Sequence, residues 1–252
     1  MKKRALPLYH FTSATSTNDL VREFLADDPM ALVIADEQTG GRGRHGKQWV
    51  GNRGQNVYCS LGVRQNKALS PAQSASYQAI GATAVADALR RIAPHIVFCI
   101  KYPNDVLALC PDGIPRKISG VLVEHDYVGA VVQSTVLGIG VNVRQTEFPQ
   151  ELAPNATSLA LLGVEADVSE VAEILTEKLT ACLTEPGVMQ RWRDELGIEG
   201  KRVTLHEGRE AFIVQKVLDD GTLLADTGLG SVIIYTGDNF RYEVNCRPAL
   251  HA

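Results

Sequence analysis

The sequence predicts an α+β protein in which a mixed, largely antiparallel sheet is flanked by helices and followed by a small C-terminal β-barrel. Strand-like segments follow one another between Ile96 and Val143 with only turns between them, which favours hairpins. Helical patterns lie before and after these strands. Beyond Gly200 the chain changes to short β-rich segments separated by glycine-containing turns. We therefore expect one domain at residues 1–199 and a second at residues 200–252.

The composition is that of an ordinary globular protein. Of the 252 residues, 45% are hydrophobic and 21% are charged, and the net charge is −4, which excludes disordered chains. No apolar run approaches the roughly 20 residues that span a bilayer. The segment after Met1 also lacks the apolar part of a signal peptide. We therefore expect a cytoplasmic protein with no membrane partner.

The first part of the chain should hold three strands, one helix and a long loop. A strand is expected at Tyr9 to Phe11, and a helix capped by Ser16 follows it through Leu25. Two further strands are expected at residues 32–35 and 57–63. The stretch between them is too rich in Gly and Arg for a helical or a strand period, so we expect a functional loop there.

A long helix and four strands should come next. Ser70 and Pro71 form an N-cap and first-turn pair that starts an alanine-rich helix ending near Ile92. Turns that contain Pro, Asn, Asp or Gly separate the strands after it. These strands are expected at Ile96 to Lys101, Val106 to Leu109, Lys117 to Glu124 and Ala130 to Val143.

The remaining elements change from helical to β. Helical patterns start at Ser158 and run over Ser169 to Leu183 and Val188 to Leu196. The second domain should then be built from five short strands. They are expected at Arg202 to His206, Ala211 to Leu218, Thr222 to Ala225, Ser231 to Tyr235 and Phe240 to Glu243, with turns at Glu207-Gly208, Asp220-Gly221, Gly228 to Gly230 and Gly237-Asp238.

The cysteines are scattered and odd in number, with no C-x-x-C pair. The sequence therefore predicts neither a disulfide framework nor a zinc site. A catalytic thiol would need a positioned His, so we expect small core residues. The five are Cys59, Cys99, Cys110, Cys182 and Cys246.

Positive charge is concentrated in one segment. Between Gln38 and Ala86 there is no Asp or Glu but there are six Lys or Arg residues, which give this segment a charge of +6. Because the net charge of the whole chain is −4, the remainder of the chain carries −10. An acidic protein binds nucleic acid poorly, but one basic loop can neutralise a small anion. The sequence therefore predicts a phosphate or carboxylate as the partner of this loop.

Residues Gly41 to Gly46 match the pattern G-x-G-x-x-G after a strand. A dinucleotide-binding fingerprint must open a helix, however, and Trp49 and the glycines after it cannot propagate one. The kinase and Walker A patterns do not match either. Glycines let backbone approach a ligand, and Arg42 and Arg44 can bind phosphate oxygens in bidentate fashion. A surface loop with chance arginines is the alternative.

Three later segments combine polar residues with strand ends or glycines. Lys101-Tyr102-Pro103-Asn104-Asp105 places a cation, an amide and a carboxylate around a turn, which is otherwise ordinary turn chemistry. Lys117 to Glu124 starts an apolar strand with a cation and continues with Gly120, where a ligand could approach closely. Gly138 to Val143 sets two glycines and Asn142 in a strand, as a bulge or a ligand contact.

Taken together and in order, these motifs resemble biotin protein ligases (biotin–[acetyl-CoA-carboxylase] ligases). The resemblance includes Ser16-Thr17-Asn18, the Gly41 to Gly46 loop with Trp49, K-Y-P-N-D, K-I-S-G-V-L-V-E and G-I-G-V-N, and it extends over residues 9–196. It implies a short form of the family, with a catalytic biotin- and ATP-binding domain at 1–199 and an SH3-like domain at 200–252. It also implies an ATP-dependent ligase that makes biotinyl-5'-AMP, releases pyrophosphate and transfers biotin to a lysine of a biotin carboxyl carrier protein.

The resemblance also implies roles for individual residues. Lys117, Arg44 and Asp105 would be catalytic, and Asp105 would also lie near the Mg²⁺ carried with ATP and the incoming lysine. The biotin-binding set would be Ser16, Thr17, Gln38, Gly41, Arg42, Arg44, Lys117, Gly120 and Gly138. The ATP-binding set would be Arg44, Lys47, Trp49, Asn104, Asp105, Lys117 and Asn142. Two positions depart from the family pattern, since Tyr102 replaces a common Trp and Lys47 a common Arg.

The residue types suit this chemistry even when the family resemblance is set aside. Joining a carboxylate to the α-phosphate of ATP brings two anions together, so cations must cancel their repulsion. A closing loop would protect the mixed anhydride from water, and its repelling arginines predict a segment at residues 39–53 that is mobile without ligand.

Three alternatives and one further property stay open at this stage. They are a lipoate or octanoate ligase or transferase, a non-enzymatic biotin sensor, and a DNA-binding repressor. The last needs several tens of residues before Tyr9, so we expect no operator binding. A homodimer is one option for the oligomeric state.

Overall fold

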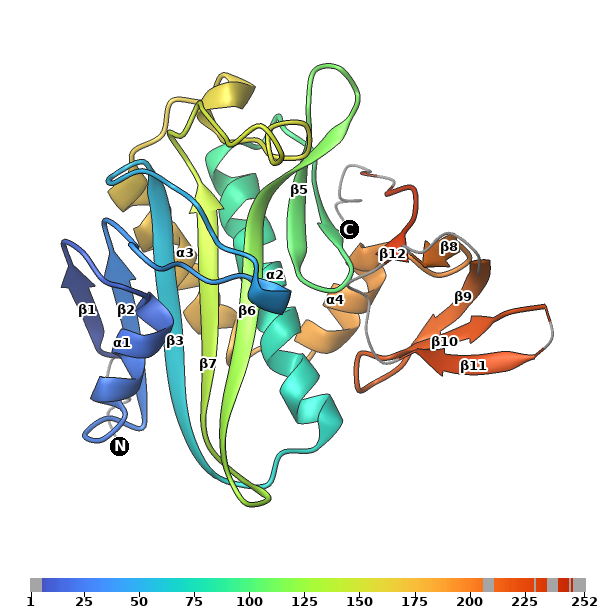
Figure 1. Cartoon of the computed structure of the whole chain (residues 1–252), viewed down its shortest axis with the longest axis horizontal. Helices are drawn as coiled ribbons and strands as arrows, with labels where there is room; N and C mark the ends of the chain where they lie inside the picture. The colour runs from blue at the N-terminus through green and yellow to red at the C-terminus, as the bar shows by residue number, and fades with distance from the viewer. Residues whose placement is uncertain (1–5, 206–210, 229, 235–239, 245, 247–252) are drawn as a thin grey trace.

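The structure is a computed structural model of the chain, and it describes residues 6–205, 211–228, 230–234, 240–244 and 246. Its elements build a large sheet with helices on both faces and a second, smaller sheet (Figure 1). In chain order they are β1 (Leu8–Phe11), α1 (Thr17–Phe24), β2 (Met30–Ala35), η1 (Arg44–Gly46), β3 (Asn56–Lys67), α2 (Pro71–Ile92), β4 (Phe98–Lys101), β5 (Asp105–Leu109), β6 (Pro115–Val128), β7 (Val131–Asn142), η2 (Ala160–Leu162), α3 (Val168–Cys182), α4 (Val188–Leu196), β8 (Arg202–Leu205), β9 (Ala211–Val217), β10 (Leu223–Asp226), β11 (Ser231–Ile234) and β12 (Phe240–Arg241).

The large sheet has seven strands in the order β1-β2-β3-β7-β6-β5-β4. Only β1 and β2 run parallel, and the other neighbours are antiparallel. The hairpins β4-β5, β5-β6 and β6-β7 arise because each pair is joined by a short turn with Pro, Asn, Asp or Gly. The mixed, largely antiparallel sheet predicted from the sequence is confirmed.

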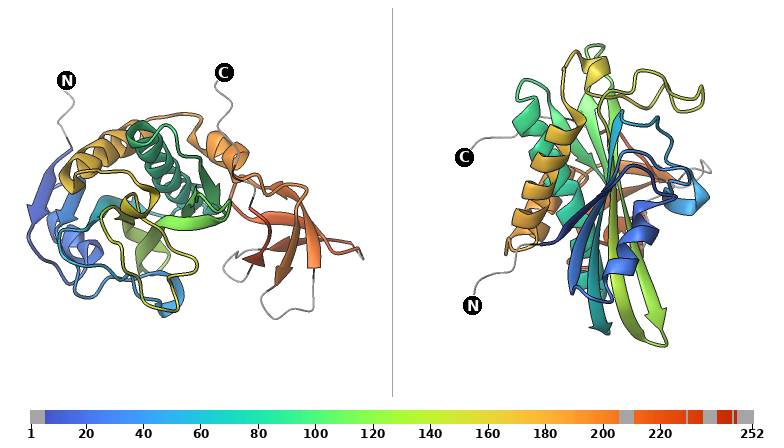
Figure 2. Two further views of the ribbon diagram at one scale, coloured as in Figure 1. Left: turned by 90° about the horizontal axis from the view of Figure 1, so that it is seen from above. Right: turned by 90° about the vertical axis from the view of Figure 1, so that its left-hand side faces the viewer.

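Helices cover the two faces of this sheet unequally. The helices α2, α3 and α4 lie on one face, where the side chains of Ile118, Val121 and Leu137 join theirs in the main core. The short helix α1 lies on the other face, as the edge-on view in Figure 2 shows. It packs there in a small cluster that includes Val21 and Val33. Because α1 covers only part of its face, the ends of the central strands there are left for a binding site.

The helix α2 has the bounds that its sequence predicts. The Ser70 side chain accepts a hydrogen bond from the Gln73 N–H, and the Gln73 side chain accepts one from the Ser70 N–H, which completes a capping box in front of Pro71. Gly81 lies against Val121 and Leu137, where a Cβ would approach their methyl groups to 2.8 and 2.9 Å. The small residues of α2 therefore bring it directly onto the sheet.

The second sheet has five strands in the order β11-β10-β9-β8-β12. Its buried side chains, such as Val214 and Leu223, belong to the same apolar cluster as α2 and the large sheet. Closure of these strands into an SH3-like barrel stays a prediction. The expected strand ends at His206 and Tyr235, the turns at Glu207-Gly208 and Gly237-Asp238, and Leu229 in the Gly228 to Gly230 turn lie outside the described residues.

One expectation about local structure was wrong, and a second was confirmed in part. The helical pattern that starts at Ser158 gives only the one-turn η2, because the chain turns left-handed at Gly163, where φ is 76°. Ser16 is the N-cap residue of α1, as predicted, but its side chain makes no capping hydrogen bond. It lines the functional pocket described below.

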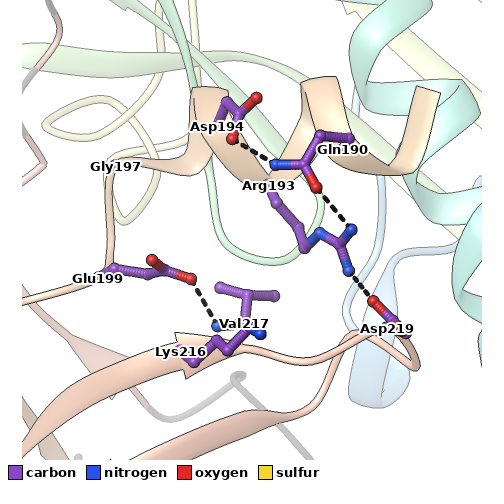
Figure 3. Close-up of a pocket in the computed structure, with 8 residues that line it drawn as sticks. All are labelled: Gln190, Arg193, Asp194, Gly197, Glu199, Lys216, Val217 and Asp219. Carbon is purple, nitrogen blue, oxygen red and sulfur yellow. Dashed lines mark hydrogen bonds and ion pairs between the residues drawn. The ribbon is translucent and has the colours of Figure 1, made fainter. Parts of the chain in front are cut away.

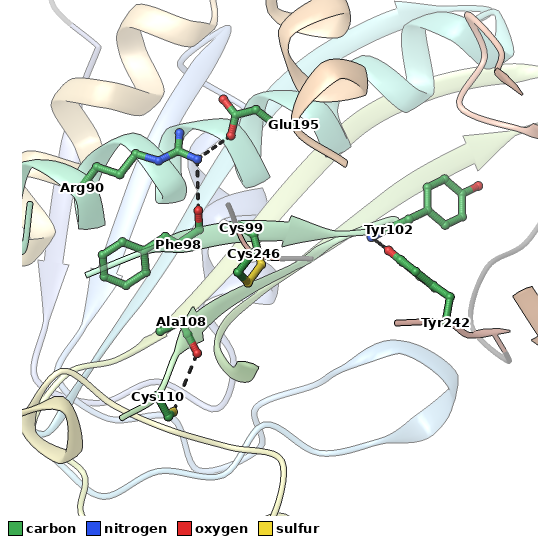
Figure 4. Close-up of a disulfide and its surroundings, with 9 residues drawn as sticks. All are labelled: Arg90, Phe98, Cys99, Tyr102, Ala108, Cys110, Glu195, Tyr242 and Cys246. Atoms are coloured by element: carbon green, nitrogen blue, oxygen red, sulfur yellow. Dashed lines mark hydrogen bonds and ion pairs between the residues drawn. A yellow bond between two sulfur atoms is a disulfide. The ribbon is translucent and has the colours of Figure 1, made fainter. Parts of the chain in front are cut away.

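The cysteines also differ from expectation, because Cys99 and Cys246 form a disulfide (Figure 4). These residues are 147 positions apart, so no local spacing could reveal the pair. It joins β4 to the segment after β12. The other three cysteines are buried and free, and burial raises the pKa of the Cys59 thiol to about 12, which suits inert core residues.

A small pocket of about 490 Å³ lies between α4 and β9 (Figure 3). Its polar groups bond to one another: Arg193 pairs with Asp219, and Glu199 accepts the Val217 N–H at 2.9 Å. These contacts join α4 and the residues after it to the second sheet.

None of the helices in the described part of the chain has the length and hydrophobicity that a membrane span requires.

Candidate functional site

A cavity of about 1460 Å³ lies on the sheet face that α1 leaves open. Its walls come from the glycine-arginine loop, the ends of β4, β5 and β6, the C-terminal part of β7, the loop before η2 and the segment after β12. The residues that line it include these predicted site residues: Ser16, Thr17, Gln38, Arg42, Arg44, Lys47, Trp49, Asn104, Asp105, Lys117, Gly120, Gly138 and Asn142. The structure therefore gathers in one place motifs that are more than 100 residues apart.

Gly41 is the predicted site residue that does not line this cavity. It is buried beside the loop, where a Cβ would approach the Trp49 carbonyl oxygen to 2.8 Å and the Gln38 amide nitrogen to 3.0 Å. Its small size lets the start of the loop pack against Gln38. Its effect on a ligand would be indirect.

An ion pair between Lys117 and Asp105 stands at the centre of the site, with Lys117 Nζ 2.5 Å from Asp105 Oδ1. A β-bulge in the pairing of β5 with β6 makes this possible. Asp105 pairs with Gly120, whereas Leu107 pairs with Lys117, so one extra residue stands between them on β6. Strict alternation would put Lys117 and Gly120 on opposite faces, and the bulge returns both to the cavity face.

The neighbouring cation, Arg116, does not share this role. Its guanidinium pairs with Asp112 in the β5-β6 turn, at 2.9 Å from Nη1 to Oδ1, and its Nε donates to the Pro154 carbonyl at 3.3 Å. The backbone N–H of Lys117 donates to the Asn155 carbonyl at 2.8 Å. The strand start is thus fixed on both sides, and of these two cations Lys117 is the one that lines the cavity.

The indole of Trp49 lies across the glycines of the central strands. A Cβ on Gly120 would come within 3.1 Å of the ring, and one on Gly140 would overlap it. The Lys117 ammonium lies 5.5 Å from the ring centroid, a cation–π contact. The Trp49 indole nitrogen is buried and has no hydrogen-bond partner among the described residues. Glycine is therefore required at these positions to admit the ring.

A chain of polar side chains forms the floor of the cavity near α1. The side-chain amide oxygen of Gln38 accepts hydrogen bonds from the Thr17 N–H at 2.8 Å and from the Thr17 hydroxyl at 2.9 Å. The buried Ser60 hydroxyl lies 2.7 Å from Thr17 Oγ1 and 2.6 Å from Asn18 Oδ1. The Asn18 side chain also occupies the space in front of Gly138. Gly138 therefore makes room for Asn18 in this structure.

Arg42 points to the rim of the cavity. It forms a bidentate pair with Asp19 of α1, at 2.6 and 2.7 Å, and reaches Glu124 of β6 at 3.3 Å. Hydrogen bonding to Arg42 holds the pKa of Asp19 below its ordinary value. Burial would raise the pKa of Glu124, but hydrogen bonds from Asn18, Arg42 and Arg22 outweigh it and lower the pKa.

The predicted repulsion between the loop arginines is offset at Arg42, because carboxylates from two elements neutralise it. Contact between Arg42 and a ligand, and mobility of residues 39–53, stay predictions. Further along the loop, the Arg44 Nη1 lies 3.4 Å from the Asn104 amide oxygen. The loop therefore leans over both ends of the cavity.

The two predicted asparagines are held by backbone groups. The Asn104 amide donates to the Val121 carbonyl at 2.7 Å, and the Asn142 amide donates to the Thr157 carbonyl at 2.9 Å. Both side chains are buried and line the cavity. Their amide oxygens and the Asp105 carboxylate are hard donors, which suits an Mg²⁺ ion held mainly by nucleotide phosphates. Among the described residues, no group of three His, Cys, Asp or Glu could hold a metal alone.

Sequence reasoning missed the contribution of the last segment of the chain. Tyr242, Glu243, Val244 and Cys246 line the cavity, although the sequence placed them in a separate domain. Phe148 and Leu152, from the loop before η2, line it as well. No local signal marks these residues, because each reaches the site only through the packing of distant elements.

The Biotin/lipoate A/B protein ligase family model matches residues 9–142, a range that includes all the predicted site residues. The chain belongs to this family. It is 33% identical to a biotin–[acetyl-CoA-carboxylase] ligase of Mycobacterium tuberculosis over 249 residues, 93% of this chain and 88% of the relative. It is 37% identical to the bifunctional ligase/repressor BirA of Bacillus subtilis over 218 residues, 82% of this chain and 65% of that protein.

Solved structures of the biotin/lipoate ligase family agree with this assignment. The biotin protein ligase of Aquifex aeolicus in complex with biotin and ATP superposes with a TM-score of 0.73 at 26% sequence identity. The match covers 95% of this chain and 99% of that one. It therefore includes the second sheet as well as the large one.

Proposed function

We propose that this protein is an ATP-dependent biotin protein ligase. The observation that carries the proposal is the Lys117–Asp105 pair on the floor of a large cavity, beneath a loop that brings Arg42 and Arg44 to its rim. A site of this kind places cations and a carboxylate where two anions must meet. The relatives named as biotin ligases, and the solved ligase with biotin and ATP, give the substrate.

In the first step the biotin carboxylate attacks the α-phosphate of ATP, and pyrophosphate leaves. The Lys117 ammonium would neutralise the carboxylate and the α-phosphate as they approach, and Arg44 would neutralise phosphate charge from the loop side. Magnesium carried with ATP would offset charge on the phosphates, near Asp105. The cavity needs no covalent nucleophile, because positioning and charge neutralisation suffice.

In the second step the neutral amine of a lysine of a biotin carboxyl carrier protein, formed when its ammonium group loses a proton, attacks the mixed anhydride, forms an amide and releases AMP and a second proton. Asp105 would receive the incoming ammonium group beside Lys117. The loop at residues 39–53 would keep water from the intermediate until that lysine arrives. The polar floor from Gln38 to Asn18 offers the donors and acceptors that a ureido ring requires.

The remaining features are part of the same proposal. Residues 1–199 would form the catalytic domain, and residues 200–252 an SH3-like domain whose strands close into a barrel. The acceptor would be a carboxyl carrier domain. Homodimer formation and the absence of operator binding stay predictions, which sedimentation and a DNA titration in the presence of biotin and MgATP would test.

Mass spectrometry after mixing the protein with biotin and MgATP tests the central claim. We expect biotinyl-AMP and pyrophosphate, followed by a carrier domain heavier by one biotinyl group when that domain is added. The same mixtures with lipoate or octanoate test the nearest alternative. Formation of lipoyl- or octanoyl-AMP in place of biotinyl-AMP would overturn the proposal, and binding of biotin with no adenylate would favour a sensor.

A further inference from the structure

The turn that carries Asp105 is held at one end by the C-terminal segment of the chain. Strand β4 is the edge of the seven-stranded sheet, so within the described residues no strand of this sheet pairs with its outer side. The N–H of Tyr102, just after β4, donates to the Tyr242 hydroxyl at 2.9 Å (Figure 4). Tyr102 is only 5% exposed, so its N–H is buried and needs this acceptor.

The other end of this turn is tied to β6. The Val121 N–H donates to the Asn104 carbonyl at 3.0 Å, and the Asn104 side chain donates to the Val121 carbonyl at 2.7 Å. Asp105 follows directly and pairs with Lys117 at 2.5 Å. The residues from Tyr102 to Asp105 therefore lie between a clamp on β6 and the hydroxyl of Tyr242.

Tyr242 is also electrostatically close to the reacting groups. Burial raises the pKa of its hydroxyl, and the negative charge of Asp105 raises it further, while the Tyr102 N–H lowers it. A tyrosine hydroxyl is neutral near pH 7 in any case, and its oxygen can accept the Tyr102 N–H. Tyr242 itself lines the cavity.

A separate contact docks the second sheet beside this turn. The Tyr102 hydroxyl donates to the Gly221 carbonyl at 2.7 Å, and its ring lies 6.2 Å from that of Trp192. The Cys99–Cys246 disulfide fastens the segment after β12, which carries Tyr242, to β4. Docking therefore does not depend on the Tyr242 hydroxyl, which makes the role of that hydroxyl separable by mutation.

We propose that Tyr242 is a positioning residue for catalysis, which fixes the Tyr102–Asp105 turn through the Tyr102 N–H and so sets Asp105 against Lys117. The inference rests on the proposed function. It assigns to the C-terminal segment a part in the chemical step, beyond its part in folding. Tyr102 supports this role, since its own hydroxyl anchors the turn to the second sheet.

The test is Tyr242→Phe, which removes one oxygen and keeps the ring. We expect biotinyl-AMP formation in single turnovers to be about 10-fold to 100-fold slower, as for small displacements of a reacting group, with KM for biotin within about twofold of the wild type. The biotin contacts predicted at Gln38 and Thr17 lie on the opposite side of the cavity, so ground-state binding should not change. A rate equal to that of the wild type would overturn the inference.

Tyr127→Phe is the matched control, because Tyr127 is 62% exposed near the β6-β7 turn. It should leave rate and KM unchanged. Tyr102→Phe weakens docking without removing the Tyr102 N–H. If Tyr242 acted only through stability, the loss of rate in Tyr102→Phe and in Tyr242→Phe would be proportional to the decrease in melting temperature that each variant shows. We expect Tyr242→Phe to lower the rate more than its melting temperature accounts for, and strict proportionality would contradict the proposal.

A double-mutant cycle then asks whether Tyr242 acts through Asp105. In an Asp105→Asn background, Tyr242→Phe should slow the residual formation of biotinyl-AMP by less than about twofold, since the group that it positions is altered already. Two losses that multiply would contradict this route. The wild type separates the two proposals, because a wild-type protein that forms no biotinyl-AMP refutes the function, whereas an active wild type with an unaffected Tyr242→Phe refutes only the positioning role.

Discussion

The two sides of the cavity are closed by opposite kinds of interaction. On the loop side, Arg42 pairs with Asp19 and Glu124, and the three side chains are 40%, 54% and 25% exposed. On the C-terminal side, the contacts of Tyr102 are neutral hydrogen bonds, and that residue is 5% exposed. One closure is charged and wet, and the other is neutral and buried.

This difference indicates which side opens. Exposed ion pairs contribute little and weaken with salt, so the loop can be released at small cost. A buried hydrogen bond leaves an unsatisfied group when it breaks, so the C-terminal side should stay shut. Ligands should therefore enter under the loop, while the opposite wall keeps Asp105 in register with Lys117.

The largest effect should come from the centre that both sides enclose. Lys117→Ala should slow biotinyl-AMP formation by at least about 100-fold, because it removes the cation that pairs with Asp105 at the centre of the cavity, and leave the fold intact. Mass spectrometry of the adenylate and a thermal melt measure the two results. Arg116→Ala is the control, since Arg116 is the neighbouring cation and pairs with Asp112. A Lys117→Ala protein that keeps near-normal synthesis would end the assignment.

The loop closure is tested by Asp19→Asn combined with Glu124→Gln. Each removes a partially exposed partner of Arg42, so we expect bound biotinyl-AMP to leave roughly threefold to tenfold faster, with the chemical step little changed. Labelled adenylate, formed on the enzyme and chased with unlabelled biotin, gives the release rate. Asp167→Asn removes an exposed carboxylate that pairs with Arg144 and should have no effect. Higher salt should speed release from the wild type more than from the double variant. Equal release rates in the two proteins would contradict a role of these ion pairs in closing the loop.

Proteolysis compares the two sides directly. Trypsin should cut free protein at Arg42, Arg44 or Lys47, and biotin with MgATP should slow this cleavage at least about threefold by favouring the closed loop. Cleavage at sites in the described part of the second sheet, such as Lys216, should change less. Loop cleavage that is equally fast with and without ligands would contradict closure.

The smallest effect should be a dependence on pH. The pKa of Asp19 and that of Glu124 are lowered from ordinary values of 3.8 and 4.5, so the stabilisation of the closed loop is present above these values. It is lost as pH falls below 4.5 and through the lowered pKa values, because the carboxylates then take up protons. Release of biotinyl-AMP should be constant above about pH 5 and rise below it. Circular dichroism must show a folded protein throughout, and an unchanged rise in the double variant would place its origin elsewhere.

Much of the fold could be predicted from local pattern. The start of α2 follows from Ser70, Pro71 and Gln73, because a capping box is complete within four residues. The strands of the large sheet follow from apolar runs between turns. The pattern at Ser158 gave too long a helix, since it could not show that Gly163 would turn left-handed. The candidate site could be predicted as motifs, because polar residues and glycines in buried strands are costly without a function.

The sequence by itself determined the class of the fold, the order of the motifs and the family to which they belong. Those properties depend on residues close together in the chain. The tertiary structure alone decided that a bulge turns Lys117 to the cavity face, that Arg42 pairs with Asp19, and that Tyr242 meets Tyr102 across 140 residues. Such contacts depend on the register and packing of distant elements, and no local periodicity encodes them.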